Sequence, residues 1–480
     1  MYGVIDVGTT GVKLAVFDNN IRCIYYEKVE LGYESVGQGR VEQNSIKLAE
    51  IVKGFAKKAK SLGARKIGLS TYRASVLAWS RTGKPLSNVI TWIDGRGREV
   101  VEKLPTWVGM LKTLSKSLGK VISPDTPAIL MKWLYNADPS LQDKVSKGDA
   151  YMWTLDSYLL FTLTGRFLSD VTSAALTGLV NPKDLSTIDI VYSLLSIPKA
   201  PPEIVDCVYD FGEFEGIEIS VSIADQQAAS VYHGLLEAGR VSGVHGTGSF
   251  IEQSTRSLIT SGKGLVPLLI ASIDGRRFYG VEGFLRSSGL IVEWLKNMGF
   301  FRSYEEMEEL ASSGRMKSIF IPSFRGLRLP EASNLRGIIT GLDPGVSKED
   351  LLKGLAWGIA LYLAFILDSI SRVAGKPQEP LWSGGGYSRS DTFLQVLADA
   401  TGMRVARTAD TEASIRGVLN LLLYSDGRIS MEELRRQPTA ERIFEPNMKE
   451  NERKALLESY ASLLRVISRW EGNVLLSGKL

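Results

Sequence analysis

The stretch IDVGTTGVKLAVFD, from Ile5 to Asp18, decides the fold. Two runs of strand-forming residues flank the turn Gly8-Thr9-Thr10, and a single carboxylate, Asp6, stands just ahead of it. Glycine permits positive φ and leaves backbone N–H groups uncovered, while threonine hydroxyls add hydrogen-bond donors without adding charge. The stretch therefore predicts a hairpin whose turn is either an ordinary connection or a site that holds phosphate.

The same device returns near the middle of the chain. The segment SGVHGTGSFIEQST again reads as a strand, the turn Gly246-Thr247-Gly248 and a second strand. Its separation from the first turn, about half the chain, predicts two similar halves rather than a solenoid of short units. The sequence contains neither G-x-x-x-x-G-K-[ST] nor G-x-G-x-x-G. A nucleotide would therefore not be bound by a P-loop or a dinucleotide fingerprint.

Composition limits the class of protein. The 480 residues suggest two domains, and 44% hydrophobic with 23% charged residues is typical of a folded, water-soluble chain. The formal charge of +4 is too small to favour nucleic acid or an anionic membrane as a partner. Cys23 and Cys207 are the only cysteines, and no signal peptide pattern occurs, so a reducing cytoplasm is expected.

Hydrophobic periodicity predicts an α/β chain. We expect strands over 2–16, 21–31, 66–69 and 75–79, and helices over 42–60, 128–136, 288–297 and 451–469. The apolar run GLAWGIALYLAFIL, Gly354 to Leu367, is shorter than the ~20 residues that span a bilayer. It therefore predicts a buried core helix.

A third glycine cluster, Gly384-Gly385-Gly386, follows an apolar strand and precedes a helix. Backbone without side chains can approach a flat ring or a ribose closely. The alternative is a helix-capping loop in which Ser388 or Ser390 is the N-cap.

Asp225, in ISVSIADQQAASVYHG, also follows a strand and leads a helix. It is either a capping aspartate or a carboxylate that accepts a hydroxyl proton. In the second role, the helix N-terminus is expected to keep it ionised.

Taken together, IDVGTTGVKLAVFD, IADQQAA, HGTGSF and WSGGGYSRSDTFLQVLADATG resemble the FGGY family of carbohydrate kinases, with its glycerol kinase branch as the nearest. The resemblance covers nearly the whole chain. It implies an α/β fold of two ribonuclease-H-like (actin/sugar-kinase ATPase) domains, with ATP and substrate in a central cleft. Residues 1–238 would carry the substrate site and the base, and residues 239–480 the nucleotide site and the C-terminal helices.

The resemblance also assigns roles to individual residues. It implies Asp225 as the catalytic base; Arg73, Trp92, Asp225, Gln226 and Phe250 as substrate-binding; Thr9, Thr10, Lys13, Thr247, Gly384 and Gly385 as nucleotide-binding; and Asp6 as the residue that helps to hold Mg²⁺.

The substrate pocket departs from the glycerol kinase pattern. Where those enzymes have an Arg-Glu pair, the segment LSTYRASVLAW has Arg73 and Ala74, and Asp125 lies near the place of a usual tyrosine. One lost polar contact costs ~1–3 kcal/mol, which is enough to reorder preferences among polyols.

Three functions therefore stay open. The first is an ATP-dependent kinase of glycerol or a similar small polyol, and the second is a kinase of a ketose such as xylulose or ribulose. The third is a non-catalytic nucleotide-binding sensor on the same fold. The expected partner is a small polyol or sugar, without nucleic acid or membrane, and with a homodimer as one option.

Overall fold

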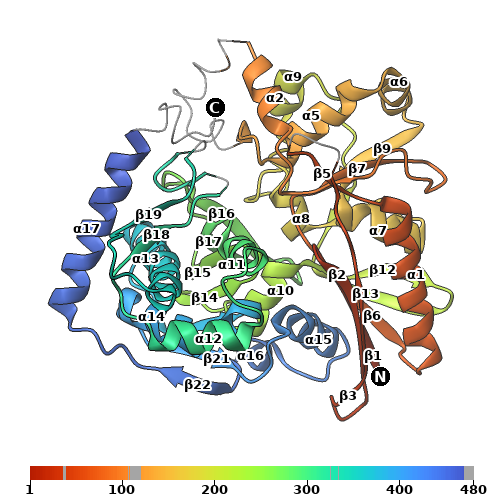
Figure 1. Ribbon diagram of the computed structural model, residues 1–480. Helices are drawn as coiled ribbons and strands as arrows, with labels where there is room; N and C mark the ends of the chain where they lie inside the picture. The colour runs from red at the N-terminus through yellow and green to blue at the C-terminus, as the bar shows by residue number, and fades with distance from the viewer. Residues whose placement is uncertain (36–38, 106–107, 109–120, 325, 333–334, 470–480) are drawn as a thin grey trace. The chain divides into compact units, whose positions relative to one another are not determined.

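The computed structural model describes residues 1–35, 39–105, 108, 121–324, 326–332 and 335–469 (Figure 1). Contacts between Cα atoms divide the chain into two compact units. Unit 1 consists of Met1–Tyr232, Leu268–Phe278 and Ser414–Leu434, and unit 2 of His233–Pro267, Tyr279–Ala413 and Arg435–Leu480. The expected α/β, two-domain architecture is confirmed.

The main sheet of unit 1 has six strands in the order β12-β13-β6-β1-β2-β3. The strand bounds are β1 Tyr2–Gly8, β2 Gly11–Phe17, β3 Cys23–Glu30, β6 Lys66–Thr71, β12 Val208–Phe214 and β13 Ile217–Ala224. Strands β1, β6 and β13 run parallel, while β2, β3 and β12 are antiparallel to their neighbours. The predicted hairpin over 5–18 is thus β1 and β2, and the parallel strands at its side bring their carboxyl ends to one edge.

Unit 1 also contains smaller sheets and most of the early helices. The smaller strands are β4 Glu34–Ser35, β5 Val41–Gln43, β7 Val76–Ser80, β8 Val89–Ile90, β9 Ala150–Thr154, β10 Leu168–Asp170 and β11 Glu203–Val205. The helices are α1 Ser45–Ser61, α2 Gly97–Lys103, α5 Pro127–Ala137, α6 Pro139–Lys147, α7 Leu155–Thr164, α8 Val171–Ala175, α9 Asp189–Leu195, α10 Asp225–Tyr232, α15 Ala413–Ser425 and α16 Met431–Leu434.

Helices cover both faces of this sheet. On one face, a Cβ at Gly3 would lie 3.0 Å from the Cβ of Ala59 in α1, and on the other a Cβ at Gly68 would lie 2.3 Å from Val418 in α15. Because both faces are buried, β1 is a nearly continuous apolar run instead of an alternating one. The helix expected over 42–60 begins later, at Ser45, because the Asn44 side chain caps it and Val41–Gln43 pairs as a strand.

The second large sheet repeats the topology of the first. Its order is β16-β17-β15-β14-β20-β21-β22, with β14, β20 and β21 parallel and the others antiparallel where pairing is assigned. The strand bounds are β14 Arg240–His245, β15 Ser249–Thr255, β16 Val266–Ile273, β17 Arg276–Leu285, β20 Gln378–Gly384, β21 Val405–Thr408 and β22 Ala440–Phe444. The expected second hairpin is therefore β14 and β15, with the turn Gly246–Gly248 between them.

The remaining elements belong to unit 2. They are α11 Ser288–Asn297, α12 Tyr304–Ser313, β18 Ile319–Ile321, β19 Ile338–Thr340, α13 Lys348–Ala374, η1 Gly386–Arg389, α14 Asp391–Thr401 and α17 Glu450–Arg469. Figure 1 shows α13 with α14 and α17 beside it. The 18-residue window of α13 that is apolar enough to cross a membrane is 83% buried inside the protein. Packing in the core thus accounts for its apolar composition, as the sequence predicts.

Candidate active site

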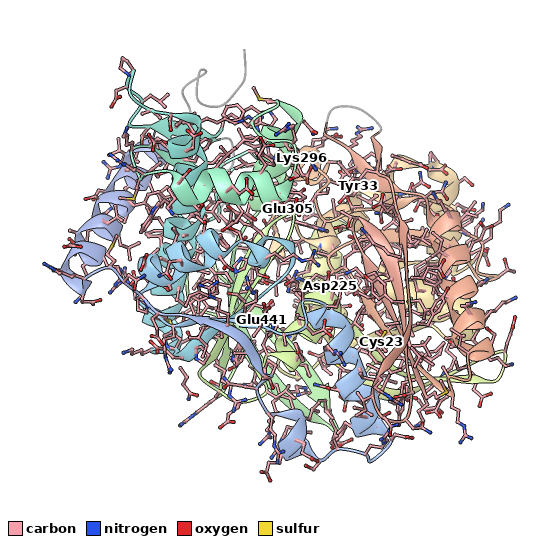
Figure 2. The ribbon with its side chains drawn as sticks, turned by 60° about the horizontal axis from the view of Figure 1, so that its bottom comes forward. Cys23, Tyr33, Asp225, Lys296, Glu305 and Glu441 are labelled. Atoms are coloured by element: carbon pink, nitrogen blue, oxygen red, sulfur yellow. The ribbon has the colours of Figure 1, made fainter. Side chains whose placement is uncertain are left out.

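Three of the predicted site segments of unit 1 lie at the carboxyl ends of its three parallel strands. The Thr9-Thr10 turn follows β1, Arg73 follows β6, and Asp225 follows β13 (Asp225 is labelled in Figure 2). The register aligns these ends, since Val7 pairs with Thr71 and Thr71 with Ala224. Ligands of open α/β sheets bind outside this edge, so the topology brings separated segments to one place.

Asp6 is held between its neighbours in the sheet. It pairs across the strands with Lys13 on β2 and with Ser70 on β6. Accordingly, the Ser70 hydroxyl donates to Asp6 Oδ1 at 2.7 Å, and Lys13 Nζ lies 3.5 Å from Asp6 Oδ2. The Asp6 side chain is buried. Ser70 did not stand out in the sequence, because its relevance comes only from the register of β1 and β6.

The Thr9-Thr10 turn is anchored through its carbonyl groups. Gln43 Nε2 donates to the Thr9 carbonyl at 2.7 Å, and the Leu31 N–H donates to the Thr10 carbonyl at 3.0 Å. Gln43 is itself fixed by the Tyr72 hydroxyl, which donates to its Oε1 at 2.5 Å. The buried side chains of Gln43 and Tyr72 thus hold the turn in place through hydrogen bonds. The sequence offered no local signal for either residue.

Asp225 is the most strongly perturbed acid at this edge. Its pKa is raised to about 7, chiefly by burial and to a smaller extent by the charge of Asp6, while the guanidinium of Arg73, the Gln226 N–H and Lys13 act against the rise. The Gln226 N–H donates to Asp225 Oδ1 at 2.7 Å. The expectation that the helix N-terminus keeps Asp225 ionised is not met, because desolvation is the largest influence on this pKa and raises it. A carboxyl with a pKa near 7 can both take and release a proton at neutral pH.

Arg73 and the glutamines after Asp225 form a second polar group. Arg73 Nη1 donates to Gln227 Oε1 at 3.3 Å. Among the described residues, Gln226 Oε1 and Gln227 Nε2 are buried without a hydrogen-bond partner. Buried polar atoms in this condition commonly meet water or a ligand. Ala74, next to Arg73, has a φ of 57°, a left-handed conformation that is uncommon outside glycine.

Trp92 is connected to Arg73 through a buried serine. The Ser75 hydroxyl donates to the Arg73 carbonyl at 3.3 Å and accepts the Trp92 N–H at 3.0 Å. Ser75 therefore fixes both segments, although the sequence did not single it out. Asp125 lies two residues before α5, in a half-buried position.

The residues at this edge fit one kind of metal site only. No group of three or more His, Cys, Asp or Glu side chains that could hold a metal occurs in the part of the chain that the structure describes. Mg²⁺ is often bound by one or two carboxylates together with waters and substrate phosphates. Asp6, a single buried carboxylate, fits a Mg²⁺ that arrives with a nucleotide, and it does not fit a cage built by the protein alone.

In unit 2, the two predicted nucleotide segments are neighbours. Val244 of β14 pairs in parallel with Gly384 of β20, so the turn after β14 and the glycines after β20 share one sheet edge. Gly385 has a φ of 88°, and a Cβ there would lie 2.6 Å from the His245 carbonyl oxygen. Only glycine fits this position. The alternative interpretation also holds in part, because Ser390 caps α14 by accepting the Phe393 N–H.

Thr247 and Phe250 occupy the turn and strand that follow β14. The Thr247 carbonyl accepts the Leu290 N–H at 3.2 Å, which ties the turn to the start of α11. The Phe250 ring lies 5.5 Å from that of Phe284, centroid to centroid. Both residues therefore belong to unit 2, whereas Arg73, Trp92, Asp225 and Gln226 belong to unit 1.

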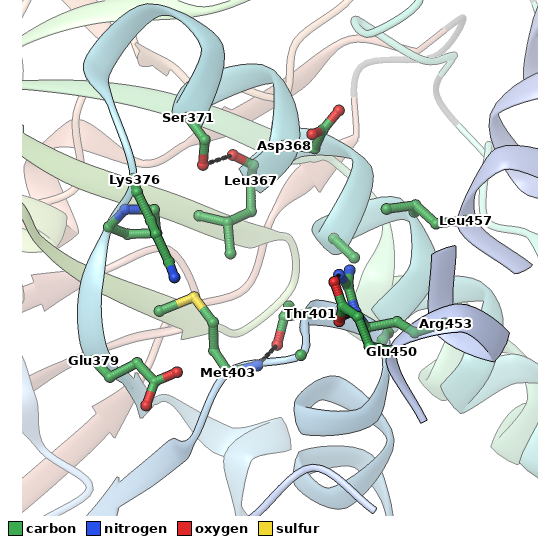
Figure 3. Close-up of a pocket in the computed structure, with 14 residues that line it drawn as sticks. Leu367, Asp368, Ser371, Lys376, Glu379, Thr401, Met403, Glu450, Arg453 and Leu457 are labelled. Carbon is green, nitrogen blue, oxygen red and sulfur yellow. Dashed lines mark hydrogen bonds and ion pairs between the residues drawn. The ribbon is translucent and has the colours of Figure 1, made fainter. Parts of the chain in front are cut away.

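A cavity of about 490 Å³ in unit 2 lies elsewhere (Figure 3). The end of α13, the residues that lead into β20 together with the start of that strand, the end of α14 and α17 form its walls, and no predicted site residue lines it. Arg453 on its wall is paired with Glu450 at 2.8 Å. The cavity is thus a groove in the helical layer, separate from the sheet edges that carry the candidate site.

Known proteins resemble this chain over nearly its full length. The family models for the N-terminal and C-terminal domains of the FGGY family of carbohydrate kinases match residues 1–215 and 241–425. A glycerol kinase of Thermococcus kodakarensis is 29% identical over 97% of both chains.

Among solved structures, Plasmodium falciparum glycerol kinase with ADP has a TM-score of 0.85 at 22% identity, covering 97% of this chain and 98% of its own. A ligand-bound xylulose kinase from Lactobacillus acidophilus has a TM-score of 0.82 at 18% identity, covering 98% and 99%. At these identities the two structures show a shared fold. The matches to both domain models identify the chain as a member of the FGGY family of carbohydrate kinases.

Proposed function

We propose that this carbohydrate kinase transfers the γ-phosphoryl group of Mg-ATP to a hydroxyl of a small polyol, with glycerol as the first candidate. The observation that carries the proposal is the group at the carboxyl ends of β1, β6 and β13. There, Asp225 has a raised pKa and lies within electrostatic range of Arg73, Asp6 and Lys13. One proton acceptor, two cations and a carboxylate for Mg²⁺ are what phosphoryl transfer to an alcohol needs.

In the proposed reaction, the acceptor hydroxyl oxygen forms a bond to the γ-phosphorus. The bond from that phosphorus to the β–γ bridging oxygen breaks, ADP leaves, and the hydroxyl proton passes to Asp225. Lys13 faces the transferred group together with Thr9 and Thr10, whose carbonyls are anchored so that the turn stays in place. When bound with the nucleotide beside Asp6, Mg²⁺ supplies neutralisation of the phosphate charge.

The substrate side of the proposal rests on Arg73 and Gln226. Their polar atoms, and the unpartnered Nε2 of Gln227, suit the hydroxyls of a polyol. Trp92, in the same unit, would supply an apolar wall. Ala74 has no side-chain group that accepts a hydrogen bond, and its small side chain leaves room. A larger substrate such as a ketose is therefore the second candidate. A relative of known fold is a xylulose kinase.

The nucleotide side of the proposal rests on Thr247, Gly384 and Gly385, which share one edge of the second sheet. The proposed division into residues 1–238 and 239–480 falls between the two matched family segments. We also propose a cytoplasmic location, which the free Cys23 and Cys207 support. A non-catalytic sensor is the least favoured function, since it would not need a base such as Asp225 that accepts the proton of a substrate hydroxyl.

The test is a panel of acceptors. Purified protein with Mg-ATP is given glycerol, dihydroxyacetone, erythritol, xylulose or ribulose, and ADP release is measured against a reaction without acceptor. We expect acceptor-dependent release with at least one compound, and loss of nearly all of it in Asp225→Asn with ATP binding retained. No turnover with any acceptor would favour the sensor, and an active Asp225→Asn would remove Asp225 as the base.

A further inference from the structure

A fully buried carboxylate in unit 1 is linked through one threonine to the residue that precedes Asp225. Asp170, the last residue of β10, caps the short helix α8 by accepting the N–H groups of Thr172 and Ser173 at 2.9 and 3.0 Å. It also accepts three hydroxyls, from Thr172, from Ser173 at 3.1 Å and from Ser222 at 3.1 Å. Ser222 belongs to β13, so this cap reaches beyond its own helix.

At the end of β13, the Thr172 hydroxyl accepts a backbone N–H that pairing with β12 does not reach. Pairing with β12 ends at Val221, and the Ser222 N–H donates to the Cys207 carbonyl. Ala224, two residues on, directs its N–H to the same side, because alternate residues of a strand do so. There the Ala224 N–H donates to Thr172 Oγ1 at 2.9 Å.

The direction of these hydrogen bonds depends on Asp170. A threonine hydroxyl has one proton, and that of Thr172 goes to Asp170 Oδ1. The oxygen of Thr172 is therefore left to accept from Ala224, the residue that directly precedes Asp225. Asp170, Thr172 and Ser222 all have no measurable exposure, so water does not compete for these bonds.

A further buried acid, Asp156, lies beside Asp170. Asp156, on α7, accepts the Ser169 hydroxyl at 2.6 Å and the Asp170 N–H at 3.2 Å. Burial, and then the charge of Asp170, raises the pKa of Asp156 above its ordinary value. Two buried acids beside one another are costly unless they are held by hydrogen bonds, which points to a purpose beyond capping a five-residue helix.

We propose that Asp170 and Thr172 are positioning residues for phosphoryl transfer: they fix the last residue of β13 and thereby the place of the Asp225 carboxylate. The inference rests on the proposed role of Asp225 as the base. Neither residue touches the reacting atoms. Loss of the Thr172 hydroxyl leaves the Ala224 N–H buried without an acceptor, and the chain that enters α10 is then free to shift.

The kinetic test compares three variants. Thr172→Val removes the hydroxyl at nearly constant volume, and Thr172→Ser retains it. Thr177→Val is the matched control, because buried Thr177 in the same unit likewise accepts a backbone N–H through its Oγ1, but from Leu179, which does not belong to β13.

We expect Thr172→Val to lower kcat about 10- to 100-fold, since a small misplacement of a reacting group costs about this much. Its KM for ATP should stay within about twofold, because the nucleotide residues are not altered. Thr172→Ser should restore most of kcat, and Thr177→Val should leave kcat unchanged. Equal kcat losses in Thr172→Val and Thr177→Val, or no loss in Thr172→Val, would overturn the proposal.

A second readout does not depend on turnover. In hydrogen–deuterium exchange, the peptide covering residues 217–226 should exchange faster in Thr172→Val than in the wild type, and not in Thr172→Ser or Thr177→Val. Unchanged exchange in Thr172→Val would overturn the inference. If the wild type transfers phosphate to no acceptor, the proposed function fails, and the exchange result alone then decides whether Thr172 fixes the end of β13.

Discussion

The raised pKa of Asp225 predicts a cost to stability that a substitution can remove. In the folded chain, burial raises this pKa from its ordinary value of 3.8 to about 7. Between these two pH values the folded chain keeps the proton and the unfolded chain releases it, so stability present below pH ~4 is lost as the pH rises to ~7. The asparagine in Asp225→Asn cannot ionise, so the free energy of unfolding of this variant does not decrease over this pH range on account of residue 225.

The structure gives the size of the effect. A pKa that rises from 3.8 to about 7 corresponds to at most about 4 kcal/mol, because each tenfold change in an equilibrium constant is worth ~1.4 kcal/mol. Part of that loss has already occurred at pH 5, and Asp225 keeps some contact with solvent. We therefore expect the advantage of Asp225→Asn over the wild type to grow by about 2 kcal/mol from pH 5 to pH 8.

The assay is urea unfolding of both proteins at pH 5 and pH 8 without nucleotide. Hydrogen–deuterium exchange of peptides from β1, β6 and β13 reads unit 1 separately from unit 2. The test is the change from pH 5 to pH 8 in the difference between the two free energies of unfolding. Any effect of the asparagine amide that does not depend on pH cancels in this comparison. An advantage of Asp225→Asn that is equal or smaller at pH 8 would refute the assigned cause, and activity of this variant should be nearly absent in the same preparation.

Three further predictions follow from the site. The kcat/KM for the acceptor should fall about tenfold for each pH unit below ~7, because Asp225 must be ionised to accept the proton; a rate that stays level down to pH 5 would contradict this. Gly385→Ala should weaken ATP binding and lower the melting temperature, because the φ of Gly385 is 88° and a Cβ there would lie 2.6 Å from the His245 carbonyl oxygen. Gly386→Ala is the control: a Cβ at Gly386 would have nothing within 4 Å, so this variant should resemble the wild type in both measurements. Burial lowers the pKa of His233 and His245 from 6.5 to about 3, so the unfolded chain binds more protons below pH 6.5 and stability falls there. The protection factors of β14 and β20 peptides, which are corrected for the pH dependence of intrinsic amide exchange, should therefore fall from pH 7 to pH 5; equal protection factors at both pH values would contradict this prediction.

Local sequence predicted the two hairpins and the place of Asp225 because their signals are local. Glycine and threonine between two apolar runs define a turn wherever they occur, and a carboxylate between a strand and a helix lies at the end of that strand. Neither feature requires knowing which strands lie next to one another in the sheet, so both could be predicted from a short stretch of sequence. The order of the four motifs then sufficed for the family.

The supporting residues could not be predicted, because they come from other parts of the chain. Ser70 reaches Asp6 only through the register of β1 with β6, and Gln43 reaches Thr9 across 34 positions of sequence. The pKa of Asp225 depends on how deeply the surrounding residues bury it, which no stretch of sequence states. The start of α1 was placed too early, because the periodic residues before Ser45 pair in a small sheet.

The most direct measurement of the central claim is the fate of the γ-phosphoryl group. Wild type and Asp225→Asn are incubated with Mg-ATP and the best acceptor of the panel, and phosphorus NMR identifies the products. We predict that the wild type converts the γ-phosphoryl group into a phosphomonoester of the acceptor and that Asp225→Asn yields almost none. Free inorganic phosphate as the sole product of the wild type, or equal yields of the phosphomonoester from both proteins, would contradict the account.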